Sequence, residues 1–163
     1  FMARSHMEVL SVPESRILPL SRSALARVVD GTARIRQRPG ADNALGGVKF
    51  VFPNDYNVYL HDTPAQSVFL LARRDVSHGC IRVAEPARLA AFVLRDQPEW
   101  TPSRIDAAMH DARPQEVTLT TPIPVFIVYT TVIARADGET LFYADIYGHD
   151  RVLAARLAIG YPY

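Results

Sequence analysis

The sequence contains a single cysteine, Cys80, among 163 residues. One thiol excludes an intramolecular disulfide framework, so the cysteine count does not indicate a redox compartment. Long apolar runs are also missing, because charge or proline interrupts each run well before the ~20 residues that a membrane-spanning helix requires. Repeats and low-complexity tracts are absent, and the 12 prolines are scattered. We therefore expect no membrane span in this chain.

A strong net charge is missing as well. The chain has 18 Lys and Arg residues against 17 Asp and Glu residues, which gives a net charge of +1. A protein with this balance has no global field that attracts nucleic acid or anionic lipid. We expect no nucleic-acid partner and expect any ligand to be recognised locally.

The length suits one domain with a single core. The first seven residues, "FMARSHM", are typical of an expression-vector remnant, so we set 1–7 aside and expect one domain over 8–163. On this interpretation, the natural N-terminus and any targeting signal lie outside the chain.

Period-two patterns rich in Val, Ile, Tyr, Phe and Thr favour half-buried strands. Such patterns lie near 33–37, 47–52, 57–61, 67–72, 79–83, 116–120, 123–134 and 139–146. Asp137-Gly138 predicts a tight hairpin between the last two, because glycine accepts the positive φ of a short turn.

Helices are fewer and are expected near 85–96, 101–109 and 150–158. In the first, Leu89, Phe92 and Val93 follow helical spacing and form one apolar face. Thr101-Pro102 suits the cap and first position of the second helix. The sum predicts a mainly β domain with peripheral helices.

Cys80 lies within "RDVSHGCIRV", and three roles are open to it: buried core residue, metal ligand or nucleophile. A zinc site is poorly supported, because His78-Gly79-Cys80 lacks the usual spacing of two to four residues and the chain has no second cysteine. We expect no metal site.

Histidine and tyrosine alternate with apolar residues in the strand before this motif. Tyr59 and His61 fall on one face and Val58 and Leu60 on the other, so the polar face is expected to look into a cleft. If 78–83 is extended, His78, Cys80 and Arg82 also share one side.

This arrangement suits thiol chemistry. A thiol of pKa near 8.5 is only slightly ionised at neutral pH, and a nearby His or Arg increases the thiolate fraction. Gly79 allows close backbone approach, so the N–H groups of Gly79 and Cys80 could stabilise an oxyanion. Spacing alone does not identify the base. His78 lies two residues from Cys80, roughly 6–7 Å along a strand, so we favour His61 from a neighbouring strand.

The segments "VYLHDTP" and "SHGCIRV" resemble the active-site signature of YkuD-type L,D-transpeptidase catalytic domains. A wider set of segments resembles the large YcbB-type branch of that family, most strongly over 33–150: "RIRQRPGADNALGGVKFVFPN", "TPSRIDAAMHD", "TPIPVFIVYTT" and "ADGETLFYADIYGHD". The resemblance implies a YkuD-type β-sandwich or mixed-sheet catalytic domain over 8–163.

The resemblance also implies roles for individual residues. Cys80 would be the acylated nucleophile, His61 its base, and Asp62 would orient the imidazole, in the family commonly through its main-chain carbonyl. Ser77 and His78 would shape the pocket and support the cysteine loop.

Two further positions are less defined. Arg82 would brace the site or contact the donor substrate. Tyr59 would line the donor groove, although a packed aromatic is an equal alternative.

The implied reaction is peptidoglycan cross-linking. A tetrapeptide stem would acylate Cys80 with loss of D-alanine, and an amine of a second stem would resolve the thioester to give a 3→3 link. Such chemistry requires no metal or organic cofactor, implies carbapenems as inhibitors, and implies a periplasmic or cell-envelope location. Two alternatives remain: a carboxypeptidase or Cys-His amidase that uses water, and an inactive wall-binding module.

The sequence departs from the family at its start. The family domain ordinarily has further strands upstream of Arg34, and the YcbB-type branch has a capping insertion, whereas 8–32 is weakly patterned. We therefore expect an N-terminally trimmed domain, or first strands on a missing fragment. Arg34, Arg36 and Arg38 alternate along one strand face, which suits either a solvated face that discourages strand pairing or a contact with stem-peptide carboxylates.

Overall fold

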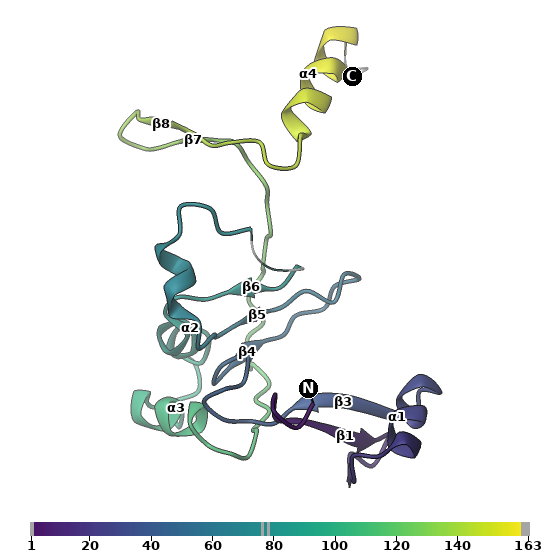
Figure 1. Cartoon of the computed structure of the whole chain (residues 1–163). Helices are drawn as coiled ribbons and strands as arrows, with labels where there is room; N and C mark the ends of the chain where they lie inside the picture. The colour runs from purple at the N-terminus through teal and green to yellow at the C-terminus, as the bar shows by residue number, and fades with distance from the viewer. Residues whose placement is uncertain (1, 76, 78, 161–163) are drawn as a thin grey trace. The chain divides into compact units, whose positions relative to one another are not determined.

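The computed structural model describes residues 2–75, 77 and 79–160. The chain divides into two compact units, Phe1–Ile123 and Pro124–Tyr163, and each is described by itself (Figure 1). The expectation of one domain over 8–163, preceded by a vector remnant, stays a prediction.

The first sheet of the N-terminal unit is antiparallel and has the strand order β2-β1-β3. Its elements are β1 (Met7–Ser11), β2 (Ile17–Leu18), β3 (Ala33–Gln37) and the helix α1 (Arg22–Val29). Ser21 caps α1 by accepting a hydrogen bond from the Ala24 N–H at 3.1 Å. Val9, Ala24 and Ala33 form a small buried core between the helix and one face of the sheet. The predicted strand over 33–37 is confirmed.

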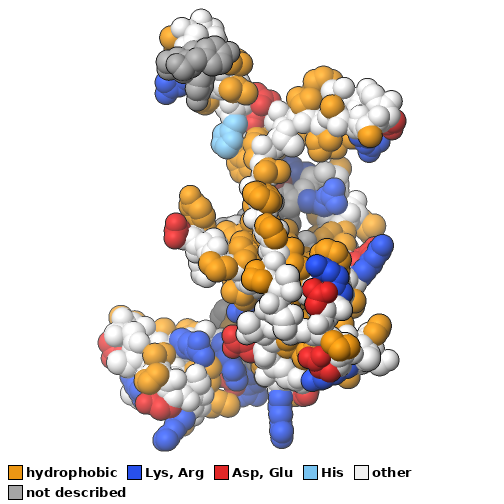
Figure 2. Space-filling view, turned by 180° about the vertical axis from the view of Figure 1, so that it is seen from behind, with side chains coloured by type: hydrophobic (Ala, Val, Ile, Leu, Met, Phe, Trp, Pro, Cys, Tyr) orange, Lys and Arg blue, Asp and Glu red, His pale blue; other side chains and the backbone are white. Residues whose placement is uncertain are grey.

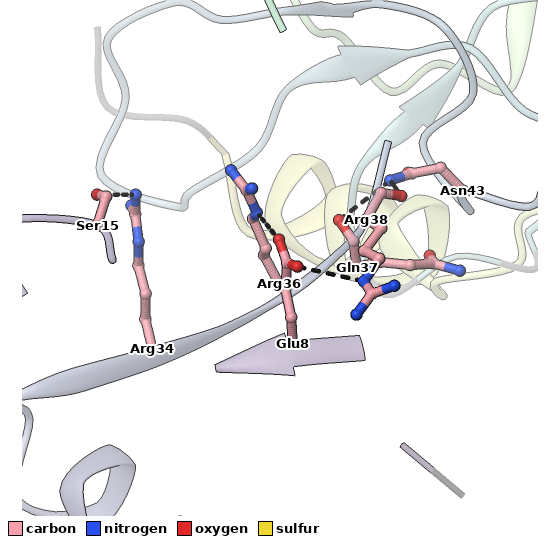
Figure 3. A network of polar contacts seen from close by, with 7 residues as sticks. All are labelled: Glu8, Ser15, Arg34, Arg36, Gln37, Arg38 and Asn43. Atoms are coloured by element: carbon pink, nitrogen blue, oxygen red, sulfur yellow. Dashed lines mark hydrogen bonds and ion pairs between the residues drawn. The ribbon is translucent and has the colours of Figure 1, made fainter. Parts of the chain in front are cut away.

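The other face of this sheet carries the three alternating arginines, two of which bind a buried carboxylate (Figure 3). Glu8 lies opposite Arg36 in the β1–β3 register, and its side chain is 5% exposed. Its oxygens accept hydrogen bonds from Arg36 Nε at 2.6 Å and Arg38 Nε at 3.3 Å. Arg34 donates instead to Ser15 Oγ at 3.1 Å. Two of the three arginines are therefore paired with a carboxylate of the protein itself.

A second sheet in the same unit is built from very short strands in the order β4-β5-β6 (Figure 1). The strands are β4 (Lys49–Phe50), β5 (Leu60–His61) and β6 (Ile81–Arg82). β4 and β5 are antiparallel, whereas β5 and β6 are parallel. These strands fall inside the predicted ranges 47–52, 57–61 and 79–83, and this sheet carries the predicted site.

Two helices form the main apolar core, α2 (Pro86–Val93) and α3 (Pro102–Met109). Thr101 caps α3 by accepting a hydrogen bond from the Arg104 N–H at 3.3 Å, as its sequence predicts. Ala90, Leu94 and Ile105 are buried between the helices. Phe92 is 55% exposed, so the expectation that it belongs to the buried face of α2 is wrong. The helix is rotated so that Ala90 and Leu94 face α3.

The C-terminal unit contains a hairpin and a helix: β7 (Val132–Ala134), β8 (Thr140–Phe142) and α4 (His149–Ile159). The hairpin turns at Gly138, whose φ is +88°, which confirms the turn predicted at Asp137-Gly138. Among the described residues of this unit only Thr131 is buried. Many apolar side chains of this unit are exposed on its surface (Figure 2), and Phe126 is 86% exposed.

Three predicted strand regions differ from the structure. Gln66–Leu70 forms the 3₁₀ helix η1, which begins after Pro64, so the strand expected at 67–72 is wrong. Residues 116–120 and 123–131 form no strand, because an apolar pattern alone does not supply a partner for the backbone hydrogen bonds. Helices hold more of the described residues than strands do, so a mainly β domain is not confirmed. No helix in the described ranges is long and apolar enough to cross a membrane.

Candidate active site

The pairing of β5 with β6 brings the two halves of the predicted site together. His61 lies opposite Arg82 in this parallel register, and Ile81 N donates to Tyr59 O at 3.0 Å. One residue back along the register, Tyr59 therefore lies beside Cys80. Residues opposite each other in neighbouring strands point to the same face. Tyr59, His61, Cys80 and Arg82 consequently share one face of the sheet.

Tyr59 interacts with both His61 and Cys80. Its ring meets that of His61 edge-on, with the centroids 6.0 Å apart. Burial, and then a hydrogen bond and charge interaction with the Cys80 thiol, raise the pKa of the Tyr59 phenol above its ordinary value of 10. The phenol therefore stays protonated at neutral pH and can act as a hydrogen-bond donor to sulfur.

The His61 ring is held by its own strand. Its Nδ1 lies 2.5 Å from the main-chain carbonyl oxygen of Asp62. Because a carbonyl oxygen only accepts hydrogen bonds, Nδ1 carries the proton, and Nε2 of the neutral ring keeps its lone pair. His61 is 5% exposed, unlike the open polar face that alternation suggested. It lies on β5, the central strand of this sheet.

Asp62 points to the opposite side and fixes the end of β5. Its Oδ2 accepts from Gly47 N at 2.8 Å and its Oδ1 from Thr63 N at 2.7 Å. Gly46 has φ +61°, and a Cβ there would lie 2.2 Å from Asp62 Oδ2. Only glycine fits this turn, which anchors the residue whose carbonyl holds His61.

Cys80 follows a turn that also requires glycine. Cys80 is partly exposed, and Gly79 before it has φ +142°, a conformation that L side chains rarely adopt. Gly79 N donates to Ser77 Oγ at 3.2 Å. Ser77 therefore supports the cysteine loop, and the Gly79 N–H that was expected to face an oxyanion already has a partner. His78 lies outside the described residues.

The structure brings Cys80, Tyr59, His61 and Arg82 together, but within 2–75, 77 and 79–160 no hydrogen bond joins Cys80 directly to His61. The two are diagonal neighbours on adjacent strands, a separation that side-chain rotation can span. No three His, Cys, Asp or Glu side chains of the described residues cluster as a metal site would require.

Lys49 is a member of this face that sequence analysis did not identify. It lies opposite His61 in the β4–β5 register, and its Nζ lies 5.3 Å from the centroid of the Tyr59 ring. The available signal was its position between Val48 and Phe50, which places the charge opposite two apolar side chains. The pattern does not predict which strand pairs with this segment, and therefore does not place Lys49 beside His61.

A cavity of about 320 Å³ in this unit lies away from the thiol. Its wall includes neither Cys80 nor His61, although Asp62 contributes to it. The lining residues are Gly40, Ala41, Gly46, Gly47, Asp62, Pro64, Met109, His110 and Asp111. The face with Cys80 is therefore a separate surface.

Comparison with known proteins gives two findings. Residues 6–127 match the YkuD family, described as the L,D-transpeptidase catalytic domain. A Haemophilus influenzae protein named "Putative L,D-transpeptidase" is 36% identical over 118 residues, which are 72% of this chain and 24% of that protein. The chain thus spans about a quarter of the length of this relative. The resemblance found in the sequence is confirmed.

Proposed function

Because this chain belongs to the family of L,D-transpeptidase catalytic domains, we propose that it is a cysteine acyltransferase that cross-links peptidoglycan stems. The observation that carries the proposal is the parallel pairing of β5 with β6. This pairing sets the thiol of Cys80 and the imidazole of His61 on one face of the sheet.

In the first step, Cys80 acts as nucleophile and His61 as base. His61 Nε2 takes the thiol proton, and the thiolate attacks the carbonyl carbon of the third stem residue, whose α-carbon is the L-centre. The C–N bond to D-alanine breaks, and the imidazolium returns its proton to the leaving amine. A thioester on Cys80 remains. The hydrogen bond from His61 Nδ1 to the Asp62 carbonyl supports this tautomer and stabilises the imidazolium.

The developing oxyanion requires a donor that has no other partner. Gly79 N already donates to Ser77 Oγ, so we assign the oxyanion contact to the Cys80 N–H. Tyr59 beside the sulfur stabilises the thiolate, and Arg82 braces His61 from β6. Ser77 and His78 support the loop rather than transfer protons.

In the second step, an amine of another stem attacks the thioester. The new amide bond forms as the C–S bond breaks, and the thiol is regenerated, which gives the 3→3 cross-link. Water in place of the amine would make the protein a carboxypeptidase or amidase with the same acyl-enzyme. A wall-binding module would form no acyl-enzyme.

The substrate also sets the location. Peptidoglycan stems are reached in the periplasm or cell envelope, so we propose that the protein acts there, with stem peptides as its partners and without a cofactor. Carbapenems, which present an acylating carbonyl to the same thiol, are the proposed inhibitors.

Intact-protein mass spectrometry after incubation with a carbapenem tests the proposal. We expect one covalent adduct on the wild type, no adduct on Cys80→Ala, and acylation slowed at least about a hundredfold in His61→Ala. Absence of the adduct on folded wild-type protein would refute the assignment. Loss in His78→Ala with an unchanged rate in His61→Ala would make His78 the base. Release of D-alanine with or without an added amine acceptor then separates transfer from hydrolysis.

A further inference from the structure

Three basic side chains form a row across the face that carries Cys80. Lys49 lies opposite His61 in the antiparallel β4–β5 pair, and His61 lies opposite Arg82 in the parallel β5–β6 pair. Because opposite residues share a face, all three point to the same side of the sheet as the thiol. We call these residues, Lys49, His61 and Arg82, the site row.

The site row has no carboxylate of its own. In the described part of the chain, no Asp or Glu oxygen lies within 4.0 Å of the charged nitrogens of Lys49 or Arg82. Asp62 is the acid next to His61 in sequence, but its carboxylate binds the N–H groups of Gly47 and Thr63. The row therefore presents the basic side chains of Lys49 and Arg82 to a ligand without an acidic partner.

Lys49 lies over the aromatic ring that adjoins the reacting groups. Its Nζ lies 5.3 Å from the centroid of the Tyr59 ring, and that ring adjoins both Cys80 and His61. An ammonium over a tyrosine face is attracted by the ring and remains open to an anion. Lys49 is also the only lysine among 18 basic residues.

The acyl donor of the proposed reaction brings an anion to this place. Its terminal D-alanine has a free carboxylate one residue beyond the carbonyl that Cys80 attacks, which is about 4 Å of chain. The carboxylate must therefore lie within a side chain's reach of the sulfur. It leaves with D-alanine, so a cation that binds it selects the donor and not the acceptor.

We propose that Lys49 is the specificity-determining residue that binds the C-terminal carboxylate of the acyl donor. This inference rests on the proposed function. The flexible four-carbon stem of lysine suits a carboxylate that arrives and departs in each cycle.

Binding measurements on Cys80→Ala, which forms no acyl-enzyme, test the inference. Two synthetic tetrapeptide stems serve as probes, one with a free C-terminal acid and one with a C-terminal amide, and calorimetry gives each Kd. We expect the acid to bind about tenfold more tightly than the amide, the range of a hydrogen bond to a charged group. In the Cys80→Ala background, Lys49→Gln should abolish the preference for the acid and leave the affinity for the amide unchanged. Lys49→Arg in the same background should retain most of the preference.

Arg82→Gln is the matched control, because it removes the same charge from the same face. It should retain the preference for the acid. Loss of the preference in Arg82→Gln and not in Lys49→Gln would overturn the assignment, as would equal loss of acid and amide affinity in Lys49→Gln, the mark of a structural role.

The single lysine permits a direct spectroscopic readout. Reductive methylation with ¹³C-formaldehyde retains the charge and labels only Lys49 and the chain's α-amino group. The Lys49 signal should shift on adding the acid stem and remain still on adding the amide; no shift with the acid would refute the contact. A wild type that a carbapenem acylates but that binds both stems equally refutes only this inference. Failure of both acylation and stem binding refutes the proposed function and this inference together.

Discussion

The two sheets of the N-terminal unit each carry a row of three basic side chains, but the rows differ in what balances their charge. Arg34, Arg36 and Arg38 run along a single strand, β3, and the buried Glu8 on β1 binds two of them. The site row runs across three strands and contacts no carboxylate in the described residues. A row with an internal acid contributes to the fold, whereas a row without one is available to a ligand.

This difference assigns the arginine row to structure. Sequence analysis left it as either a solvated face or a contact for stem-peptide carboxylates. Glu8 occupies the position that a ligand carboxylate would take beside Arg36 and Arg38, and its side chain is 5% exposed. Replacing Glu8 in the arginine row should therefore lower the stability of the fold. Adding an acid beside the site row should lower its affinity for a ligand carboxylate.

The largest effect is expected for Glu8→Gln. It should lower the free energy of unfolding by about 2 kcal/mol, because the neutral amide weakens two charge-assisted hydrogen bonds at a buried position. Urea unfolding followed by the fluorescence of Trp100, the only tryptophan, measures this loss. Glu85→Gln is the control, since the exposed Glu85–Arg88 pair should contribute less than about 0.5 kcal/mol. Equal losses would remove the distinction between a buried and a surface acid.

Gly46→Ala tests the turn that holds the Asp62 carboxylate away from the site row. A Cβ at this left-handed position would displace the Asp62 carboxylate from the Gly47 and Thr63 N–H groups. We expect a loss of about 1–2 kcal/mol in stability. Carbapenem acylation should also slow, because the Asp62 carbonyl that holds His61 moves with it. Gly138→Ala, at φ +88° with open space around it, should cost about 1 kcal/mol without changing acylation. Unchanged acylation in Gly46→Ala would contradict this account.

Val51→Glu would make the site row resemble the arginine row. Val51 is 70% exposed and directly follows β4. It is two residues from Lys49, so continuing the strand's alternation by one residue would place its side chain on the same face. An internal carboxylate there should compete with the donor and raise the KM of the acid stem about fivefold, the upper range for an exposed pair. Val51→Gln should leave this KM unchanged. If both variants behave alike, the charge of the row does not determine donor binding.

The smallest effect is expected for Tyr59→Phe. In the proposed mechanism the hydroxyl beside Cys80 donates a hydrogen bond to the thiolate, and the raised pKa of the phenol keeps this donor protonated at neutral pH. Its removal should make the thiolate less stable, slow acylation near neutral pH about threefold, and displace the pH–rate curve to higher pH. Tyr143→Phe, in the C-terminal unit, is the control and should change neither. A downward displacement in Tyr59→Phe would show that the hydroxyl disfavours the thiolate.

Local signals in the sequence predicted local structure well. The hairpin at Asp137-Gly138, the cap at Thr101 and the strand over 33–37 all agree with the structure. The segment before Arg34 was judged weakly patterned, yet β1 and α1 form there, because the strand gains its stability from pairing with β3. Apolar alternation over 67–72, 116–120 and 123–131 predicted strands that are not present, since alternation does not supply a partner.

The sequence by itself determined which residues can perform thiol chemistry: a lone cysteine after glycine, and a histidine in a strand of alternating polar and apolar residues. It also determined the turns and caps, because their geometry depends on neighbouring residues. Only the tertiary structure decided which side chains meet: Lys49 with His61 and Tyr59, and Glu8 with Arg36. Strand pairing joins positions that are distant in the chain, and its register depends on backbone hydrogen bonds that every residue type can form.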